Sequence, residues 1–316
     1  MTNDTQSSSR TVEQSNTRRA KKLLGPRIVI EPRDDGFPKA LLTIPRPPKR
    51  LWAIGDARAF AEGISIIGAR KATPYGRGCA RRFARIAASL GVPVVSGGAL
   101  GCDSEAHRGA LEAGGTTLAI LGGGCDQLYP ARNIPLFQQI VDSGGAVASE
   151  HSWNEPPLPW MFRERNRLIA GLSKATLVVE AGLPSGTFST ADEALIAGKD
   201  VLVVPGPITS PTSSGSNRLI AQGAMPIVDD ECFEDVMSSL FGTMRHGEPD
   251  KPPEFPDEPL LAALMACPMR IDEMLAKGLA TDYVQLNLAL SRYEKSGIIA
   301  RYPDARYGPS QAWVSK

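Results

Sequence analysis

The chain has 316 residues, of which 42% are hydrophobic, and its formal net charge at pH 7 is +1. This length allows more than one domain, and the near-zero charge excludes a global basic field, so nucleic-acid binding would need a local patch. The five cysteines stand singly, without a Cys-x-x-Cys pair, which argues against disulfides and a zinc site. The sequence shows no apolar leader and no stretch long enough to span a membrane. We therefore expect a soluble cytoplasmic protein that needs no cofactor.

The first 56 residues divide into two segments by composition. Residues 1–27 are rich in Ser, Thr, Asn, Gln and charge, and we predict that they form a disordered tail. Their basic cluster at 18–22 is compatible with nucleic-acid contact, but a solvated tail is the favoured interpretation. Residues 28–56 hold many prolines between 36 and 48, which disfavours regular structure there and predicts an extended arm laid against the main domain.

Residues 57–244 show a regular alternation of short apolar runs and helix-like segments. This alternation is typical of βαβ units and a parallel sheet. The runs are apolar throughout, as expected for strands covered on both faces. We therefore predict a doubly wound α/β domain. Its strands are expected at Ile64–Ile67, Val92–Val95, Thr117–Leu121, Ala146–Ser149, Ala175–Glu180, Val201–Val204 and Pro226–Val228.

A proline-rich charged linker is predicted at residues 245–256, and a small domain follows it over residues 257–316. Three short helical patterns and then a two-stranded wing give the order of a winged-helix domain. The third helical pattern carries few cations, so contact with a protein is favoured at least as much as the reading of duplex DNA. The expected elements are Pro259–Cys267, Ile271–Lys277, Asp282–Lys295, Ile298–Tyr302 and Gln311–Val314.

Two glycine turns, residues 68–76 and 96–101, follow the first two strands predicted for this sheet. In a parallel α/β sheet both turns lie at the carboxyl ends of adjacent strands, where such folds bind ligands. The first turn contains two cations, and backbone N–H groups in such turns can bind phosphate oxygens. We expect the turns to form the floor of an anion-binding crevice. The candidate residues are Gly68, Arg70, Lys71, Ser96 and Gly97.

Two further segments carry cations near the ends of predicted strands. In the glycine-rich loop after the third strand, Tyr129 offers a stacking face, and Arg132 and Asn133 offer phosphate or base contacts. Segment 162–171 has arginines at three alternate positions. Since these cannot share one helix face, some must turn toward the crevice, although a salt-bridged surface with Glu164 is the alternative. The candidates in this segment are Arg163, Arg165, Asn166 and Arg167.

The segment Ser185-Gly186-Thr187 ends a strand and opens a helix. Ser185 or Thr187 would cap that helix while its free N–H groups receive a phosphate. Asp103 and His107 are four residues apart, but without a third ligand nearby a helix cap and a structural histidine are favoured, and no metal site is expected. The sequence has no Gly-x-x-x-x-Gly-Lys-[Ser/Thr] motif, so nucleotide hydrolysis by a phosphate-binding loop is not indicated.

Together these residues resemble the DNA-processing protein A family, also called DprA or Smf. The resemblance spans about residues 36–230, with a family-like winged helix beyond it. The motifs that match are Ile67-Gly68-Ala69-Arg70-Lys71-x-Thr73-Pro74-Tyr75-Gly76, Ser96-Gly97-x-Ala99-x-Gly101-x-Asp103-x-x-Ala106-His107, Leu121-Gly122-x-Gly124-x-Asp126-x-x-Tyr129-Pro130-x-x-Asn133, Arg165-Asn166-Arg167-Leu168-Ile169-Ala170-Gly171, Ser185-Gly186-Thr187 and Gly215-x-Asn217-x-Leu219-Ile220.

The resemblance implies an extended Rossmann-like domain that binds single-stranded DNA without sequence specificity and homodimerises. It also implies loading of the RecA recombinase during natural transformation, and no enzymatic activity. It assigns DNA contact to Arg70, to Arg132 and Asn133, and to residues 165–167. Leu100 stands where the family usually has an arginine, which removes one cation. The full predicted DNA-binding set is Gly68, Arg70, Lys71, Ser96, Gly97, Tyr129, Arg132, Asn133, Arg163, Arg165, Asn166, Arg167, Ser185, Gly186 and Thr187.

The competing hypothesis is a nucleotide-binding enzyme. The chain is also similar, more distantly, to lysine-decarboxylase-like phosphoribohydrolases, which release bases from nucleoside monophosphates. Their signature, Pro-Gly-Gly-x-Gly-Thr-x-x-Glu after an Arg-x-x-Arg segment, is echoed at residues 184–187 and by Arg163 and Arg167. The expected glutamate falls at Thr190. Without that carboxylate the general acid or base is missing, so this alternative is disfavoured.

Overall fold

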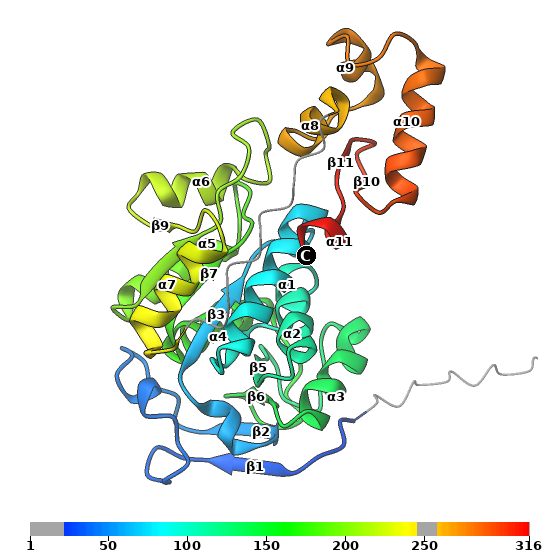
Figure 1. Cartoon of the computed structure of the whole chain (residues 1–316). Helices are drawn as coiled ribbons and strands as arrows, with labels where there is room; N and C mark the ends of the chain where they lie inside the picture. The colour runs from blue at the N-terminus through cyan, green and yellow to red at the C-terminus, as the bar shows by residue number, and fades with distance from the viewer. Residues whose placement is uncertain (1–21, 245–257, 316) are drawn as a thin grey trace, which may run out of the picture.

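The computed structural model describes residues 22–244 and 258–315. Over these residues the chain forms a large α/β domain on one nine-stranded sheet and a small C-terminal module (Figure 1). The strands of the large sheet, in spatial order, are β1 (Arg27–Ile30), β2 (Leu51–Gly55), β6 (Ala146–Ser149), β5 (Thr117–Ile120), β4 (Val94–Ser96), β3 (Gly63–Ile67), β7 (Ser173–Val178), β8 (Asp200–Val203) and β9 (Met225–Pro226).

Strands β3 to β9 pair parallel with one another, which confirms the predicted doubly wound fold class. The strand order reverses at β3, which pairs with β4 on one side and with β7 on the other. All residues of β3 are buried, as expected for an apolar strand covered on both faces. The point of reversal leaves a crevice at the carboxyl ends of β3 and β7.

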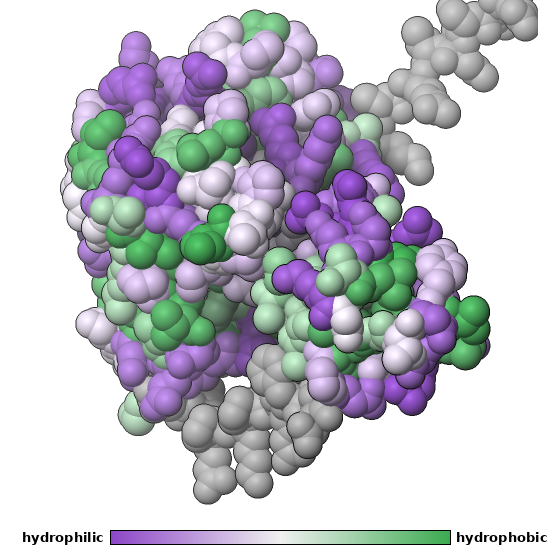
Figure 2. All heavy atoms as spheres, turned by 90° about the horizontal axis from the view of Figure 1, so that it is seen from above, coloured by the Kyte–Doolittle hydropathy of each residue, from purple (hydrophilic) through white to green (hydrophobic). Residues whose placement is uncertain are grey.

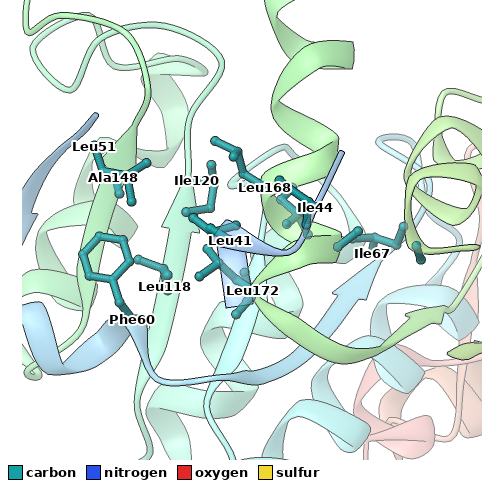
Figure 3. Close-up of a cluster of buried hydrophobic side chains, with 14 of the residues drawn as sticks. Leu41, Ile44, Leu51, Phe60, Ile67, Leu118, Ile120, Ala148, Leu168 and Leu172 are labelled. Atoms are coloured by element: carbon teal, nitrogen blue, oxygen red, sulfur yellow. The ribbon is translucent and has the colours of Figure 1, made fainter. Parts of the chain in front are cut away.

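Helices cover both faces of the sheet (Figure 1). One face is covered by α1 (Pro74–Ser89), α2 (Cys102–Glu112), α3 (Ile134–Asp142) and α7 (Asp230–Phe241). The other face is covered by α4 (Pro159–Gly171), α5 (Thr187–Ile196) and α6 (Ser214–Ala221). Figure 3 shows this second core, where Leu168 and Leu172 lie beside Leu41 and Ile44. Short helical turns are η1 (Lys39–Leu42), η2 (Ala57–Phe60) and η3 (Ala131–Asn133).

The N-terminal segment contributes two strands that the sequence analysis did not predict. β1 and β2 pair antiparallel with each other, and β2 also pairs antiparallel with β6. The prolines between 32 and 48 fall outside both strands, so the strands keep all their backbone donors. Leu23 is only 3% exposed and belongs to the core around α3, and Arg27 begins β1, so this part of the predicted tail is packed on the domain. Residues 1–21 of that tail lie outside the described residues.

The C-terminal module has the element order of a winged helix. Three helices, α8 (Pro259–Ala266), α9 (Ile271–Ala276) and α10 (Tyr283–Lys295), precede the antiparallel pair β10 (Ile299–Arg301) and β11 (Tyr307–Pro309). The predicted second wing strand at Gln311–Val314 is wrong. Ser310 accepts a hydrogen bond from the backbone N of Trp313 at 3.0 Å and caps a short helix there, α11.

The module packs on the large domain through α11. Val314 lies against α1, where a Cβ added at Gly78 would come within 2.5 Å of it. Gln311 Nε2 donates to Glu105 Oε2 of α2 at 2.8 Å. From above, the module forms a second lobe beside the large domain (Figure 2). The predicted linker at residues 245–256 lies outside the described ranges, and the domain boundaries stay predictions. In the part of the chain that the structure describes, we find no helix with the length and apolar character to cross a membrane.

Candidate nucleic-acid interface

A cleft of about 840 Å³ opens where the strand order reverses. It is bounded by the glycine turn after β3, the segment from 182 to 190 after β7, and the first turns of α4. Open α/β sheets bind their ligands at this position, outside the carboxyl ends of the strands. Residues that line the cleft come from both predicted glycine turns and from three other loops. We refer to this space as the cleft.

The first glycine turn is held in place by a buried glutamate. Glu180 follows β7, and its carboxylate accepts from the backbone N and the Oγ1 of Thr73 at 2.8 and 2.9 Å. Burial raises the pKa of Glu180, and hydrogen bonds from Thr212 and Thr73 oppose the rise. Thr73 in turn caps α1 by accepting from the backbone N of Gly76 at 3.1 Å. The hydrogen bonds from Thr73 to Glu180 therefore fix the glycine turn that carries Arg70 to the end of β7.

Arg70 lines the cleft beside two aromatic rings. Its Cζ lies 5.5 Å from the ring centroid of Phe162 in α4, and the ring of Tyr129 meets Phe162 edge-on with centroids 5.6 Å apart. Arg70 is exposed, and no carboxylate of residues 22–244 or 258–315 comes within ion-pair distance of it. A guanidinium without a counterion can bind a phosphate. The adjacent rings offer faces on which a base can stack.

The arginines of α4 go to three different places. Arg163 is exposed and lines the cleft. Arg165 also lines it but is only 5% exposed, because its Nη1 donates to the carbonyl oxygens of Gly97, at 2.7 Å, and Ile120. Arg167 is buried away from the cleft, and its Nη2 lies 2.5 Å from Glu150 Oε2. The sequence pattern predicted the divergence of these side chains correctly, but Arg167 does not face the cleft.

Two buried residues of opposite charge, Asp103 and Arg165, line the floor of the cleft. Burial raises the pKa of Asp103, and the charges of Arg165 and Arg70 oppose the rise. Burial also lowers the pKa of Arg165 to about 10, which the charge of Asp103 opposes. A Cβ added at Gly97 would meet both residues, at 2.4 Å from Arg165 Nη1 and 2.7 Å from Asp103 Oδ2. Gly97 is therefore needed for close packing here.

Several predicted site residues turn out to hold the scaffold. Ser96 Oγ is buried and donates to the carbonyl oxygen of Ile66 at 2.7 Å. Asn133 is buried and its Nδ2 donates to the carbonyl oxygen of Gly98 at 2.8 Å, which ties its loop to the second glycine turn. Their hydrogen-bonding groups are thus used inside the protein. Lys71 and Arg132 are exposed, and neither lines the cleft.

The third wall of the cleft is the start of α5. Ser185 Oγ accepts from the backbone N of Thr187 at 3.2 Å in a local turn, but the N-cap position of α5 is Gly186 and no side chain caps the helix, so the predicted cap by Ser185 or Thr187 is wrong. Gly186 has open space around its Cα, because an added Cβ would meet no heavy atom within 4 Å. Asn166 also lines the cleft, close to this wall, with its Nδ2 3.4 Å from Ser189 Oγ. The N–H groups of Thr187, Phe188 and Ser189 donate to Ser185 Oγ and to the carbonyl oxygens of Ser185 and Gly186, so the N–H groups that the sequence analysis expected to be free for a phosphate are used inside the protein.

Carboxylates are scarce in this cleft. Of the described residues that line it, Asp103 is the one acid, and it is buried beside Arg165. Thr190 occupies the position where the enzyme hypothesis requires a glutamate, and it lines the cleft. His107 is fully buried, with Nδ1 2.7 Å from Thr117 Oγ1, and burial lowers its pKa to about 3. It is a structural histidine, as the sequence analysis favoured.

The sequence analysis missed the role of Phe162. The segment 162–171 was singled out for its arginines, and the aromatic residue at its start was not among the candidates. The available signal was the adjacency of an aromatic ring and Arg163 at a helix start after proline-rich residues 156–159. Pro157 and Pro159 from that stretch also line the cleft. Aromatic and proline side chains supply the apolar part of the cleft wall.

Comparison with known proteins gives consistent matches over the large domain. The family model described as DNA recombination-mediator protein A matches residues 28–240. Protein Smf of Escherichia coli strain K12 is 39% identical over 218 residues, covering 68% of this chain and 57% of that protein. The chain spans about half the length of the curated relatives it matches.

Solved structures agree with these matches. The structure of DNA processing protein A from Streptococcus pneumoniae aligns with a TM-score of 0.63 and 30% identity, covering 72% of this chain and 77% of that chain. The structure of DNA processing protein A from Helicobacter pylori, described for its single-stranded DNA binding mode, has a TM-score of 0.63 and 29% identity. It covers 70% of this chain and 100% of that chain. The family resemblance predicted from the motifs is confirmed.

Proposed function

Because this chain belongs to the DNA recombination-mediator protein A family, we propose that its cleft binds single-stranded DNA without sequence specificity. The observation that carries the proposal is the placement of Arg70 5.5 Å from the ring of Phe162 in a cleft at the strand-order reversal. A cation beside aromatic rings is the combination that binds a phosphate backbone and its bases together. The described binding mode of the Helicobacter pylori relative supports this assignment.

In this proposal the cleft binds the strand by two kinds of contact, ion pairs with phosphates and stacking with bases. Arg70 and Arg163 neutralise phosphates, and N–H groups of the first glycine turn fix backbone oxygens. Bases lie on Phe162 and Tyr129, which offer π-faces and so accept every base. Lys71 and Arg132, which are exposed outside the cleft, extend the path of the strand. Leu100, 38% exposed, stands beside this path at the position where the family resemblance implies an arginine.

The wider role follows the family resemblance. We propose that the protein acts in the cytoplasm as a homodimer that helps to load the RecA recombinase onto single strands during DNA processing. Two clefts on one dimer would hold one strand with greater avidity than a single cleft. No catalytic step is part of this proposal, since the cleft lining holds Asp103 as its single acid among the described residues.

The test is binding of labelled oligo-dT and of a matched duplex across a salt series. We expect a clear preference for the single strand, a linear fall of log affinity with log salt concentration, and a large loss for Arg70→Ala. Arg58→Ala is the matched control, because Arg58 is 91% exposed and its partner is the nearby Asp56. A wild-type protein that does not bind oligo-dT at low salt would overturn the proposal. Release of free base from nucleoside monophosphates would then favour the phosphoribohydrolase alternative.

A further inference from the structure

A cluster of metal-ligating side chains lies outside the cleft, between the end of β6 and α4. Glu150 and His151 follow β6 directly, and Glu164 lies in the second turn of α4. Each residue offers one ligand atom, and these atoms lie within 4.8 Å of one another. Within residues 22–244 and 258–315 this is the one group of three or more His, Cys, Asp or Glu with such spacing.

Two polar atoms of this cluster are buried without a partner. Glu150 Oε1 and His151 Nε2 make no hydrogen bond, although both atoms are shielded from solvent. The two side chains are only 13% and 12% exposed. An unsatisfied buried polar atom costs about 1–3 kcal/mol, so native proteins pair nearly all of them. A bound ion at this place would satisfy both atoms together.

The other nitrogen of the histidine ring faces a carboxylate at a distance beyond a hydrogen bond. His151 Nδ1 lies 3.6 Å from Glu155 Oε1, and the ring of Trp160 packs edge-on against the imidazole with centroids 6.0 Å apart. A metal-binding histidine usually directs its second ring nitrogen to a carboxylate, which fixes the tautomer and the ring orientation. Here the arrangement leaves the Nε2 lone pair of His151 free to bind an ion.

The charges in the cluster also favour a divalent cation. Glu150, Glu155 and Glu164 bring three carboxylates, and Arg167 brings one guanidinium, with Nη2 2.5 Å from Glu150 Oε2. Among these carboxylates and the guanidinium, two negative charges remain uncompensated. Arg167 occupies Oε2 of Glu150 and leaves Oε1 available. Buried carboxylates are stable when they are paired or bind a metal ion.

We propose that Glu150, His151 and Glu164 bind one divalent metal ion, and that the chemistry of the donors fits Zn²⁺. One imidazole and two carboxylates form a three-ligand set of the kind that binds zinc, with a fourth position left for water. The ion would join the segment after β6 to α4, which carries Phe162 and Arg163. Glu155 is a positioning residue that acts through His151. The proposal stands on this cluster alone and does not depend on DNA binding.

The test uses the full-length, untagged protein after removal of metals with a chelator. Zn²⁺ alone is added, and bound metal is measured by equilibrium dialysis and elemental analysis. We expect one ion per wild-type chain and a rise of the melting temperature with zinc concentration. Glu164→Gln and His151→Gln should each lower the affinity at least about 100-fold, and Glu155→Gln about 10- to 100-fold. Glu294→Gln, at an exposed site on α10 of the C-terminal module, should bind like the wild type.

Substitution with Co²⁺ identifies the donor atoms directly. We expect visible d–d bands of a nitrogen–oxygen site that disappear in Glu164→Gln, while circular dichroism shows that this variant stays folded. A folded wild type that takes up no ion contradicts the proposal. So does uptake that both substitutions leave unchanged. A near-ultraviolet sulfur-to-cobalt band would place the ion on one of the five cysteines and also overturn the assignment.

Discussion

The guanidinium of Arg70 lies 5.5 Å from the ring centroid of Phe162, although the two residues belong to distant parts of the chain. Arg70 is presented by the glycine turn after β3, and Phe162 by the first turn of α4, and both line the cleft. The fold therefore places a cation and a stacking surface side by side. This pairing separates a strand-binding cleft from a simple anion site.

The stacking role of Phe162 predicts a specific loss of affinity. In Phe162→Ala the affinity for oligo-dT should fall by about 1–3 kcal/mol, which is about 5- to 150-fold, because a base loses its stacking partner. Phe162→Trp should restore most of it. Fluorescence anisotropy measures both. Tyr283→Ala is the control, because this ring is 59% exposed in the C-terminal module. Equal losses in Phe162→Ala and Tyr283→Ala would contradict the stacking role.

Two arginines of α4 should respond in opposite ways to the same substitution. Arg165→Met removes the larger of the two charges that oppose the burial penalty of Asp103, together with the hydrogen bonds to the carbonyl oxygens of Gly97 and Ile120, so the free energy of unfolding should fall by about 3–5 kcal/mol. Arg163→Met removes an exposed side chain, so its unfolding free energy should change by less than about 0.5 kcal/mol while its affinity for oligo-dT falls. Urea unfolding and anisotropy on the same samples separate the two effects. A stable Arg165→Met protein would refute the account of the buried pair.

Gly97 should tolerate no side chain. In Gly97→Ala the new Cβ would meet Arg165 Nη1 at 2.4 Å, so the surrounding groups must shift, at a cost of about 1–3 kcal/mol. Gly36→Ala is the matched control, since a Cβ there meets no heavy atom within 4 Å. Its melting temperature should equal or exceed that of the wild type. The melting temperatures of both variants are compared with that of the wild type. Equal melting temperatures for Gly97→Ala and Gly36→Ala would show that the Arg165 side chain moves aside without cost, which would contradict this prediction.

Stability should depend on pH through His107. Burial lowers the pKa of His107 from 6.5 to about 3, so below pH 6.5 the unfolded chain binds a proton that the folded protein does not. The contribution of His107 to stability is therefore complete above pH 6.5 and is lost as the pH falls toward 3. Between pH 7 and pH 5 the loss should be about 2 kcal/mol. Urea unfolding at both pH values should show a smaller loss for His107→Gln than for the wild type, and equal losses would contradict this assignment.

The sequence predicted the sheet, the strand ends and the glycine turns well, because apolar runs and glycines are local signals. It could not predict which polar side chains form hydrogen bonds or ion pairs inside the protein, because their partners are distant in the chain. Arg167 and Asn133 look like ligand-binding residues in their motifs, but Glu150 and the carbonyl oxygen of Gly98 hold them inside the protein. Phe162 is the opposite case. Its sequence context does not mark it as a ligand-binding residue, and its proposed role becomes visible only because the fold places Arg70 beside it.

The edges of the domains were harder to predict for the same reason. β1 is a short strand after Pro26 and before Pro32, and its pairing with β2 is a tertiary contact. At the other end, the alternation in Gln311–Val314 resembled a strand, but Ser310 caps a helix there and α11 packs on α1. Local composition could not predict these elements, because each depends on packing against a segment that is distant in the chain.

The most direct test of the central claim is photo-crosslinking of oligo-dT that carries iododeoxyuridine, followed by mass spectrometry of the attached peptides. The cleft account predicts crosslinks to Phe162 and Tyr129, and their loss in Arg70→Ala at salt concentrations where Arg58→Ala still crosslinks. Crosslinks confined to the C-terminal module, or an unchanged pattern in Arg70→Ala, would contradict it.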